Sequence, residues 1–67
     1  MELRITSKSR AFLEKNAPEV LKADSLRNAL ISLYEWIEIH GFTPDNKYNS
    51  LGEQAQEAYD DIYDNND

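Results

Sequence analysis

Cysteine is absent from this 67-residue sequence, so neither a disulfide nor a thiolate-bound metal can stabilise its fold. Long apolar runs are absent too, because no stretch approaches the roughly 20 residues that a membrane-spanning helix needs. The opening segment, MELRITSKSR, lacks the apolar stretch of a signal peptide. These absences favour a cytoplasmic protein, held together by the packing of one small core.

Motifs for catalysis or cofactor binding are also missing. Gly41 and Gly52 stand alone, whereas a phosphate-binding loop needs clustered glycines. His40 is the single histidine, and no pattern supplies it with a nucleophile and an orienting group. We expect His40 to interact with the negative end of a helix dipole instead. The sequence therefore predicts a protein that is not an enzyme and has no cofactor.

The many carboxylates raise the question of a calcium site. A calcium-binding loop of the EF-hand type that began at Asp45 would need an oxygen ligand third, glycine sixth and glutamate twelfth. The sequence has Lys47, Ser50 and Gln56 at those positions. The carboxylates of residues 60–67 are interpreted as solvated side chains, so no metal site is predicted.

What the sequence does contain is a strong helical pattern between Asp24 and Gly41. Asp24 or Ser25 is expected to cap the helix, and Gly41 to end it in the left-handed conformation. A helical projection places the expected buried residues within an arc of about 160°. These residues are Leu26, Ala29, Leu30, Leu33, Tyr34, Trp36, Ile37 and His40.

Three further segments complete the predicted fold. Residues 1–6 form an extended arm, with a short strand as an alternative, and residues 7–16 form a helix that ends before Pro18. A short turn over 19–22 follows, although one kinked helix over 7–23 is the alternative. Residues 42–49 form a loop whose flanking aromatics, Phe42 and Tyr48, are expected to fold back onto the core.

The last predicted helix covers residues 50–63 and begins with a capping box formed by Ser50 and Glu53. Its expected apolar stripe consists of Leu51, Ala55, Ala58, Tyr59 and Ile62. Residues 64–67 are expected to fray as an acidic tail. The prediction is therefore an all-α protein: one domain over residues 1–63, built as a small three-helix antiparallel bundle with an extended N-terminal arm.

Two sets of residues suggest how such a bundle could bind a partner. Ile31 and Ile39 lie on the polar side of the central helix, where either another segment covers them or they contact a partner. Tyr59 and Tyr63 stand one turn apart and could form either the edge of the core or an interface. The first hypothesis is a non-enzymatic protein–protein interaction module that binds another protein or a second copy of itself.

Charge supports the alternative hypothesis. Residues 1–33 carry six Lys and Arg against four Asp and Glu, whereas residues 34–67 carry one lysine against nine acidic residues. The halves could attract each other within the fold, or the acidic half could bind a basic partner. The predicted acidic face of the last helix consists of Glu53, Glu57, Asp60 and Asp61. With this face, the protein could act as an acidic decoy that occupies the nucleic-acid-binding site of a basic protein. Direct binding to nucleic acid is not expected, because phosphates would repel these carboxylates, and no membrane partner is expected.

Overall fold

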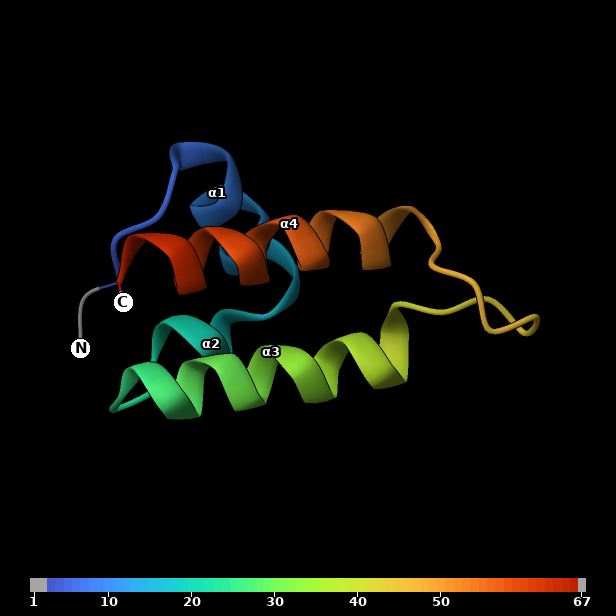
Figure 1. Ribbon diagram of the computed structural model, residues 1–67, viewed down its shortest axis with the longest axis horizontal. Helices are drawn as coiled ribbons and strands as arrows, with labels where there is room; N and C mark the ends of the chain where they lie inside the picture. The colour runs from blue at the N-terminus through green and yellow to red at the C-terminus, as the bar shows by residue number, and fades with distance from the viewer. Residues whose placement is uncertain (1–2, 67) are drawn as a thin grey trace.

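A computed structural model describes residues 3–66, which form four helices around one core (Figure 1). These helices are α1 (Ser7–Asn16), α2 (Pro18–Leu21), α3 (Leu26–His40) and α4 (Ser50–Asn65). α3 and α4 run antiparallel, α1 packs against α4, and α2 packs against α3. The predicted all-α bundle with an extended arm is confirmed, with α2 as a short fourth helix.

α3 is the central helix that the sequence predicts. The side chain of Ser25 caps it by accepting a hydrogen bond from the Asn28 amide at 3.1 Å. Ala29, Leu33 and Ile37 are its buried residues, and they face the other helices. The backbones that lie closest to α3 are those of α2 and α4, and its buried strip is narrower than the predicted arc.

Two side chains of the predicted arc, Tyr34 and His40, are exposed, so their predicted burial is wrong. Trp36 is partly buried and meets Phe12 of α1 edge to face, with ring centroids 5.8 Å apart. The core that results is made mainly of aliphatic side chains from all four helices and from Leu3 of the arm. Its fully buried large members are Leu13, Val20, Leu33 and Ile62.

The break between α1 and α2 lies at Ala17, immediately before Pro18. The hydroxyl of Thr6 caps α1 by accepting a hydrogen bond from the Ser9 amide at 3.2 Å. Pro18 begins α2 at a position where its missing N–H costs nothing. Residues 7–21 therefore form two helices, as predicted, and the alternative of one kinked helix is wrong.

A glycine-to-glycine contact joins the end of α3 to the start of α4. A Cβ placed on Gly52 would lie 2.0 Å from the carbonyl oxygen of Gly41, and a Cβ on Gly41 would lie 3.0 Å from the Gly52 Cα. The prediction of a left-handed Gly41 is wrong, because its φ is −94°. Gly41 is needed for this close approach of two backbones, and its conformation is one that other residues adopt.

Asn49 caps both helices at this junction. Its side-chain oxygen accepts a hydrogen bond from the Gly52 amide at 2.7 Å, and its side-chain nitrogen donates to the His40 carbonyl at 3.0 Å. The predicted capping box of Ser50 is wrong, because Ser50 is already the first residue of α4. The sequence predicts a buried Leu51, but this side chain is exposed, since Gly52 takes the position that faces α3.

The arm is held against the end of α4 by Asn66, which directly follows the last residue of that helix. The Asn66 amide group accepts a hydrogen bond from the Arg4 backbone N–H at 2.8 Å and donates one to the Arg4 carbonyl, also at 2.8 Å. The arm is extended without forming a strand over residues 3–6. The expected end of the last helix at Tyr63 is wrong, because α4 continues to Asn65; Asp67 of the expected tail lies outside the described residues.

The loop between α3 and α4 forms a narrow turn that projects from the bundle (Figure 1). Phe42 and Tyr48 make an isolated antiparallel bridge, and their rings stack with centroids 4.9 Å apart. Asn46, with φ of 61°, supplies the left-handed residue of the turn. Both aromatic side chains remain exposed, so the prediction that they fold onto the core is wrong.

Candidate protein-binding groove

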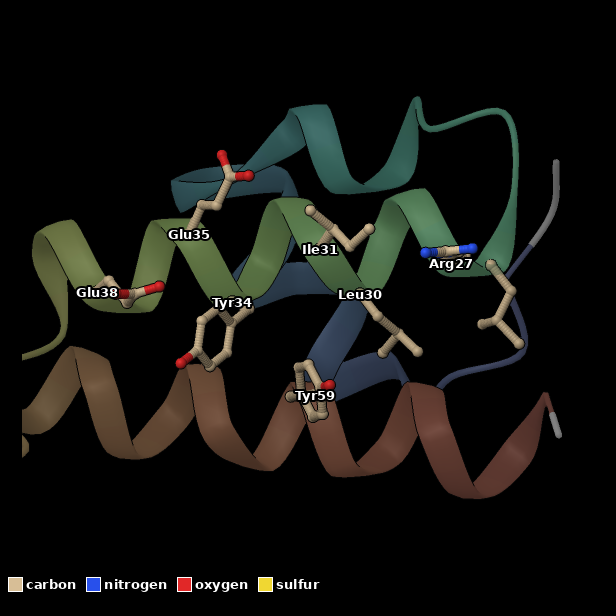
Figure 2. A pocket seen from close by; sticks show the side chains of 8 residues that line it. Arg27, Leu30, Ile31, Tyr34, Glu35, Glu38 and Tyr59 are labelled. Atoms are coloured by element: carbon tan, nitrogen blue, oxygen red, sulfur yellow. The ribbon is translucent and has the colours of Figure 1, made fainter.

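An apolar groove of about 560 Å³ runs along α3 at the surface of the bundle, and α4 borders it on one side (Figure 2). Its apolar lining consists of Leu26, Leu30, Ile31, Tyr34 and Tyr59. Its charged lining consists of Arg27, Glu35 and Glu38. The groove is open to solvent. Small molecules usually bind in pockets that enclose them, whereas an open apolar groove is typical of sites that bind one face of a helix.

The spacing of residues along α3 creates the exposed wall of the groove. Arg27, Ile31, Tyr34 and Glu38 are separated by four, three and four positions, so a helix places them in one stripe. Ile31 is 43% exposed and Tyr34 is 57% exposed. Two apolar side chains in the middle of the stripe are therefore bounded by a positive charge at one end and a negative charge at the other.

α4 supplies the opposite wall. Figure 2 shows Leu30 and Tyr34 reaching from α3 toward α4, with Tyr59 of α4 beneath them. Leu30 of α3 and Tyr59 of α4 are partly buried against the core, and together they form the floor of the groove. The apolar floor is thus preformed by the packing that also holds α3 against α4.

The charges at the two ends of α3 have signs that do not suit the helix itself. Arg27 lies in the first turn, near the positive end of the helix dipole, and Glu38 lies in the last turn, near the negative end. Within residues 3–66 neither of them has an ion-pair partner, because the ion pair found there joins Lys8 to Glu57. The stability of the single chain therefore does not account for this arrangement.

The groove brings together only half of the residues that the sequence suggested as a partner surface. Ile31 and Tyr59 both line it. Ile39 is 73% exposed and lies on the α2 side of α3, in a smaller hollow with Glu19 and Trp36. Tyr63 is exposed one turn beyond Tyr59 and does not line the groove.

Sequence reasoning missed most of the groove because it assigned Leu26, Leu30 and Tyr34 to the buried side. The signal that could have found it is the four-three-four spacing of the stripe that Arg27 begins and Glu38 ends. That spacing describes a helix contact face that is distinct from the one that packs on the core.

The predicted acidic face of α4 is largely engaged by its own chain. Glu57 forms an ion pair with Lys8 of α1 at 3.3 Å, and Asp61 accepts hydrogen bonds from the amide and hydroxyl of Thr6 at 2.9 and 2.8 Å. Asp60 accepts a hydrogen bond from Gln56 at 3.1 Å, and Glu53 is exposed. The basic and acidic halves of the sequence therefore meet where α1 packs on α4.

Asp61 is the carboxylate whose charge is most clearly stabilised. The Ser9 hydroxyl contributes most, and the Thr6 and Asn65 groups add to it, so the pKa of Asp61 lies below its ordinary value of 3.8 despite an opposing effect of burial. A lowered pKa in the folded state means that Asp61 contributes stability at pH values above 3.8. This contribution is lost as the pH falls through the lowered pKa.

The Asp61→Asn variant should therefore be less stable than the wild type by about 1 kcal/mol at neutral pH, because the hydrogen bonds to Thr6 lose a charged acceptor. Its stability should also decline less steeply in acid than that of the wild type. Urea unfolding followed by circular dichroism over a pH series measures both effects. Asp64→Asn removes an exposed carboxylate nearby and should behave as the wild type does; equal acid sensitivity of Asp61→Asn and the wild type would contradict the assignment.

The residues considered for other chemistry are separate from the groove. His40 is exposed at the end of α3, and its ring lies 5.1 Å from that of Trp36. Within residues 3–66, no three His, Asp or Glu side chains gather closely enough to hold a metal ion. In the same part of the chain, no helix combines the length and apolar character needed to cross a membrane.

Comparisons of the chain with models of protein families, with curated proteins and with solved structures found no match. The class of the protein, a small all-α bundle, follows from its own helices. Its function is inferred from the groove and from the charges that border it.

Proposed function

We propose that the protein is a non-enzymatic protein–protein interaction module that binds an amphipathic helix in the α3–α4 groove. The observation that carries the proposal is the exposed stripe of α3, in which Ile31 and Tyr34 lie between charges of opposite sign. The proposal places this activity in the cytoplasm, because small proteins outside reducing compartments commonly depend on disulfides and this chain has no cysteine.

A helix is the ligand that fits the shape and chemistry of the groove. The groove follows the direction of α3, and a helix in such a groove contacts it through apolar residues that recur every three or four positions. Ile31 and Tyr34 would pack against those residues. Arg27 would select a negative charge at one end of the ligand, and Glu38 a positive charge at the other.

Tyr34 and Arg27 are also the residue types that contribute most to binding energy at protein interfaces. Tyr34 offers a large ring that loses little conformational entropy on binding, and more than half of its surface is exposed. Arg27 offers a planar cation that can pair with a carboxylate through two hydrogen bonds. Both lie at positions where a bound helix would remove them from water.

The alternative of an acidic decoy has less support. A decoy needs free carboxylates to stand in for phosphates, whereas Glu57 is paired with Lys8 and Asp61 is bound to Thr6. Only Glu53 and Asp60 of the predicted acidic face remain without a bond to another helix or the arm. We therefore place the binding surface on the α3–α4 groove.

Replacing Ile31 with lysine tests the proposal, because it puts a charge in the middle of the apolar stripe. We expect a partner that the wild-type protein captures from the cell that encodes it to be captured at least about tenfold less well by Ile31→Lys. Quantitative affinity capture followed by mass spectrometry gives the measurement. Because Ile31 is partly exposed, the variant should keep the circular dichroism spectrum of the wild type.

Ile39→Lys is the matched control, since it makes the same change on the same helix at a residue that is more exposed and outside the groove. It should capture the partner as the wild type does. Capture that survives Ile31→Lys but is lost when Glu53, Glu57, Asp60 and Asp61 are neutralised together would contradict the proposal and support the decoy.

A further inference from the structure

We infer that the helix bound in the groove is α3 of a second copy of this chain, paired antiparallel to the first across a two-fold axis. The inference rests on the proposed function, because it names the partner of the same groove. It follows from the order of the side chains on the stripe. When two copies of the stripe run in opposite directions, each charged residue faces the opposite charge and each apolar residue faces an apolar one.

The pairing has one register that satisfies every member of the stripe. An axis midway between Ile31 and Tyr34 places Ile31 of each copy opposite Tyr34 of the other. The same axis places Arg27 of each copy opposite Glu38 of the other, because both pairs of residues are centred on the same point of α3. Antiparallel helices pack with this alternation of positions, so the register is also the one that side-chain packing favours.

The helix dipoles support the same arrangement. In the single chain, Arg27 lies near the positive end of α3 and Glu38 near its negative end, which is unfavourable for both. In the antiparallel pair, Arg27 approaches the negative end of the second α3, and Glu38 approaches its positive end. The charge placement that the single chain does not explain becomes favourable at both ends of the interface.

The groove extends the apolar surface of the stripe toward α4. Leu30 and Tyr59 form an apolar floor next to Ile31 and Tyr34, so the apolar contact extends from α3 to the adjacent side of α4. Glu35 stands one turn before Glu38, within reach of the arginine of the second copy. Eight lining residues per copy are fewer than a standard interface contains, so the dimer should be weak and its dissociation constant micromolar or higher.

Reversing the charges separately and together tests this register. Arg27→Glu and Glu38→Arg each place like charges opposite one another at two symmetric contacts, so each should weaken dimerisation about tenfold. The double variant Arg27→Glu/Glu38→Arg restores opposite charges and should dimerise several times more tightly than either single variant. Sedimentation velocity from low micromolar to millimolar protein measures the dissociation constants, with Ile39→Lys as a control that should dimerise normally.

Both single changes put charges of the favourable sign at the ends of α3, so these variants should fold at least as well as the wild type. Loss of dimerisation would then report on the interface. A wild-type protein that stays monomeric up to millimolar concentration would overturn the inference, while the capture experiment with Ile31→Lys still decides the proposed function. A dimer that the charge reversals leave unchanged, or that the double variant does not recover, would overturn the antiparallel register.

Discussion

Replacing Gly52 with alanine is expected to lower the free energy of unfolding by about 2–3 kcal/mol. A Cβ at this position would lie 2.0 Å from the Gly41 carbonyl oxygen and 2.9 Å from its carbonyl carbon. Both are backbone atoms, so no side-chain rotation can relieve the overlap, and α3 must move away from α4. Without this contact, alanine would stabilise the interior of a helix by about 1 kcal/mol relative to glycine. The sign of the change in stability therefore shows whether the two backbones touch.

Thermal unfolding followed by circular dichroism measures this effect. A loss of 2–3 kcal/mol should lower the Tm by about 10 °C or more in a domain of this size. Gln54→Ala, at an exposed position two residues further along α4, is the matched control and should change the Tm little. An equal or higher Tm for Gly52→Ala would mean that the two backbones are not in contact.

Leu33→Ala should have the largest effect of any single change in α3, lowering the free energy of unfolding by about 3 kcal/mol. Leu33 is fully buried in the middle of α3, where α2 and α4 pack against that helix. The truncated side chain would leave a cavity that rigid helices on both sides cannot close. Because a core of this size supplies only about 3–5 kcal/mol, the variant should be largely unfolded near 37 °C.

Urea unfolding at low temperature, where some folded protein remains, gives the size of this loss. Ile39→Ala is the control, because its side chain is 73% exposed and its removal should change the stability by less than about 0.5 kcal/mol. Similar losses at Leu33 and Ile39 would contradict the packing of α3, since they would place both side chains in equivalent surroundings.

The parts of the fold that the sequence predicts are those that local chemistry determines. Pro18 breaks the helical region at Ala17, Ser25 caps α3, and the helical period of residues 26–40 identifies that helix. Each of these features depends on residues within one or two turns. Patterns of that length can be recognised in the sequence without knowing what lies opposite them.

The features that the sequence could not predict depend on residues brought together by packing. The contact of Gly41 with Gly52 requires the antiparallel arrangement of α3 and α4, so each glycine alone resembles an ordinary helix terminus. Tyr34 has the same helical period as the buried residues, but its side chain lies in the open groove between α3 and α4 and stays 57% exposed.

The candidate groove was only partly foreseen for the same reason. Ile31 and Ile39 are equivalent in the sequence, since both are isoleucines on the polar side of one helix. Ile31 lines the same groove as Tyr59 of α4, whereas Ile39 lines a smaller hollow with Glu19 of α2. The position of the neighbouring helices therefore separates a groove residue from an ordinary exposed side chain.

The attachment of the arm has a consequence for the order in which the protein folds. The bonds from Arg4 to Asn66 and from Thr6 to Asp61 join residues 62 and 55 positions apart, whereas the bond from Asn49 to His40 spans only nine. Since the entropy lost in closing a loop rises with its length, the α3–α4 hairpin can form before the arm docks. Contacts that form late in folding act mainly on the rate of unfolding. The bonds of the arm should therefore slow unfolding and have little effect on the rate of folding.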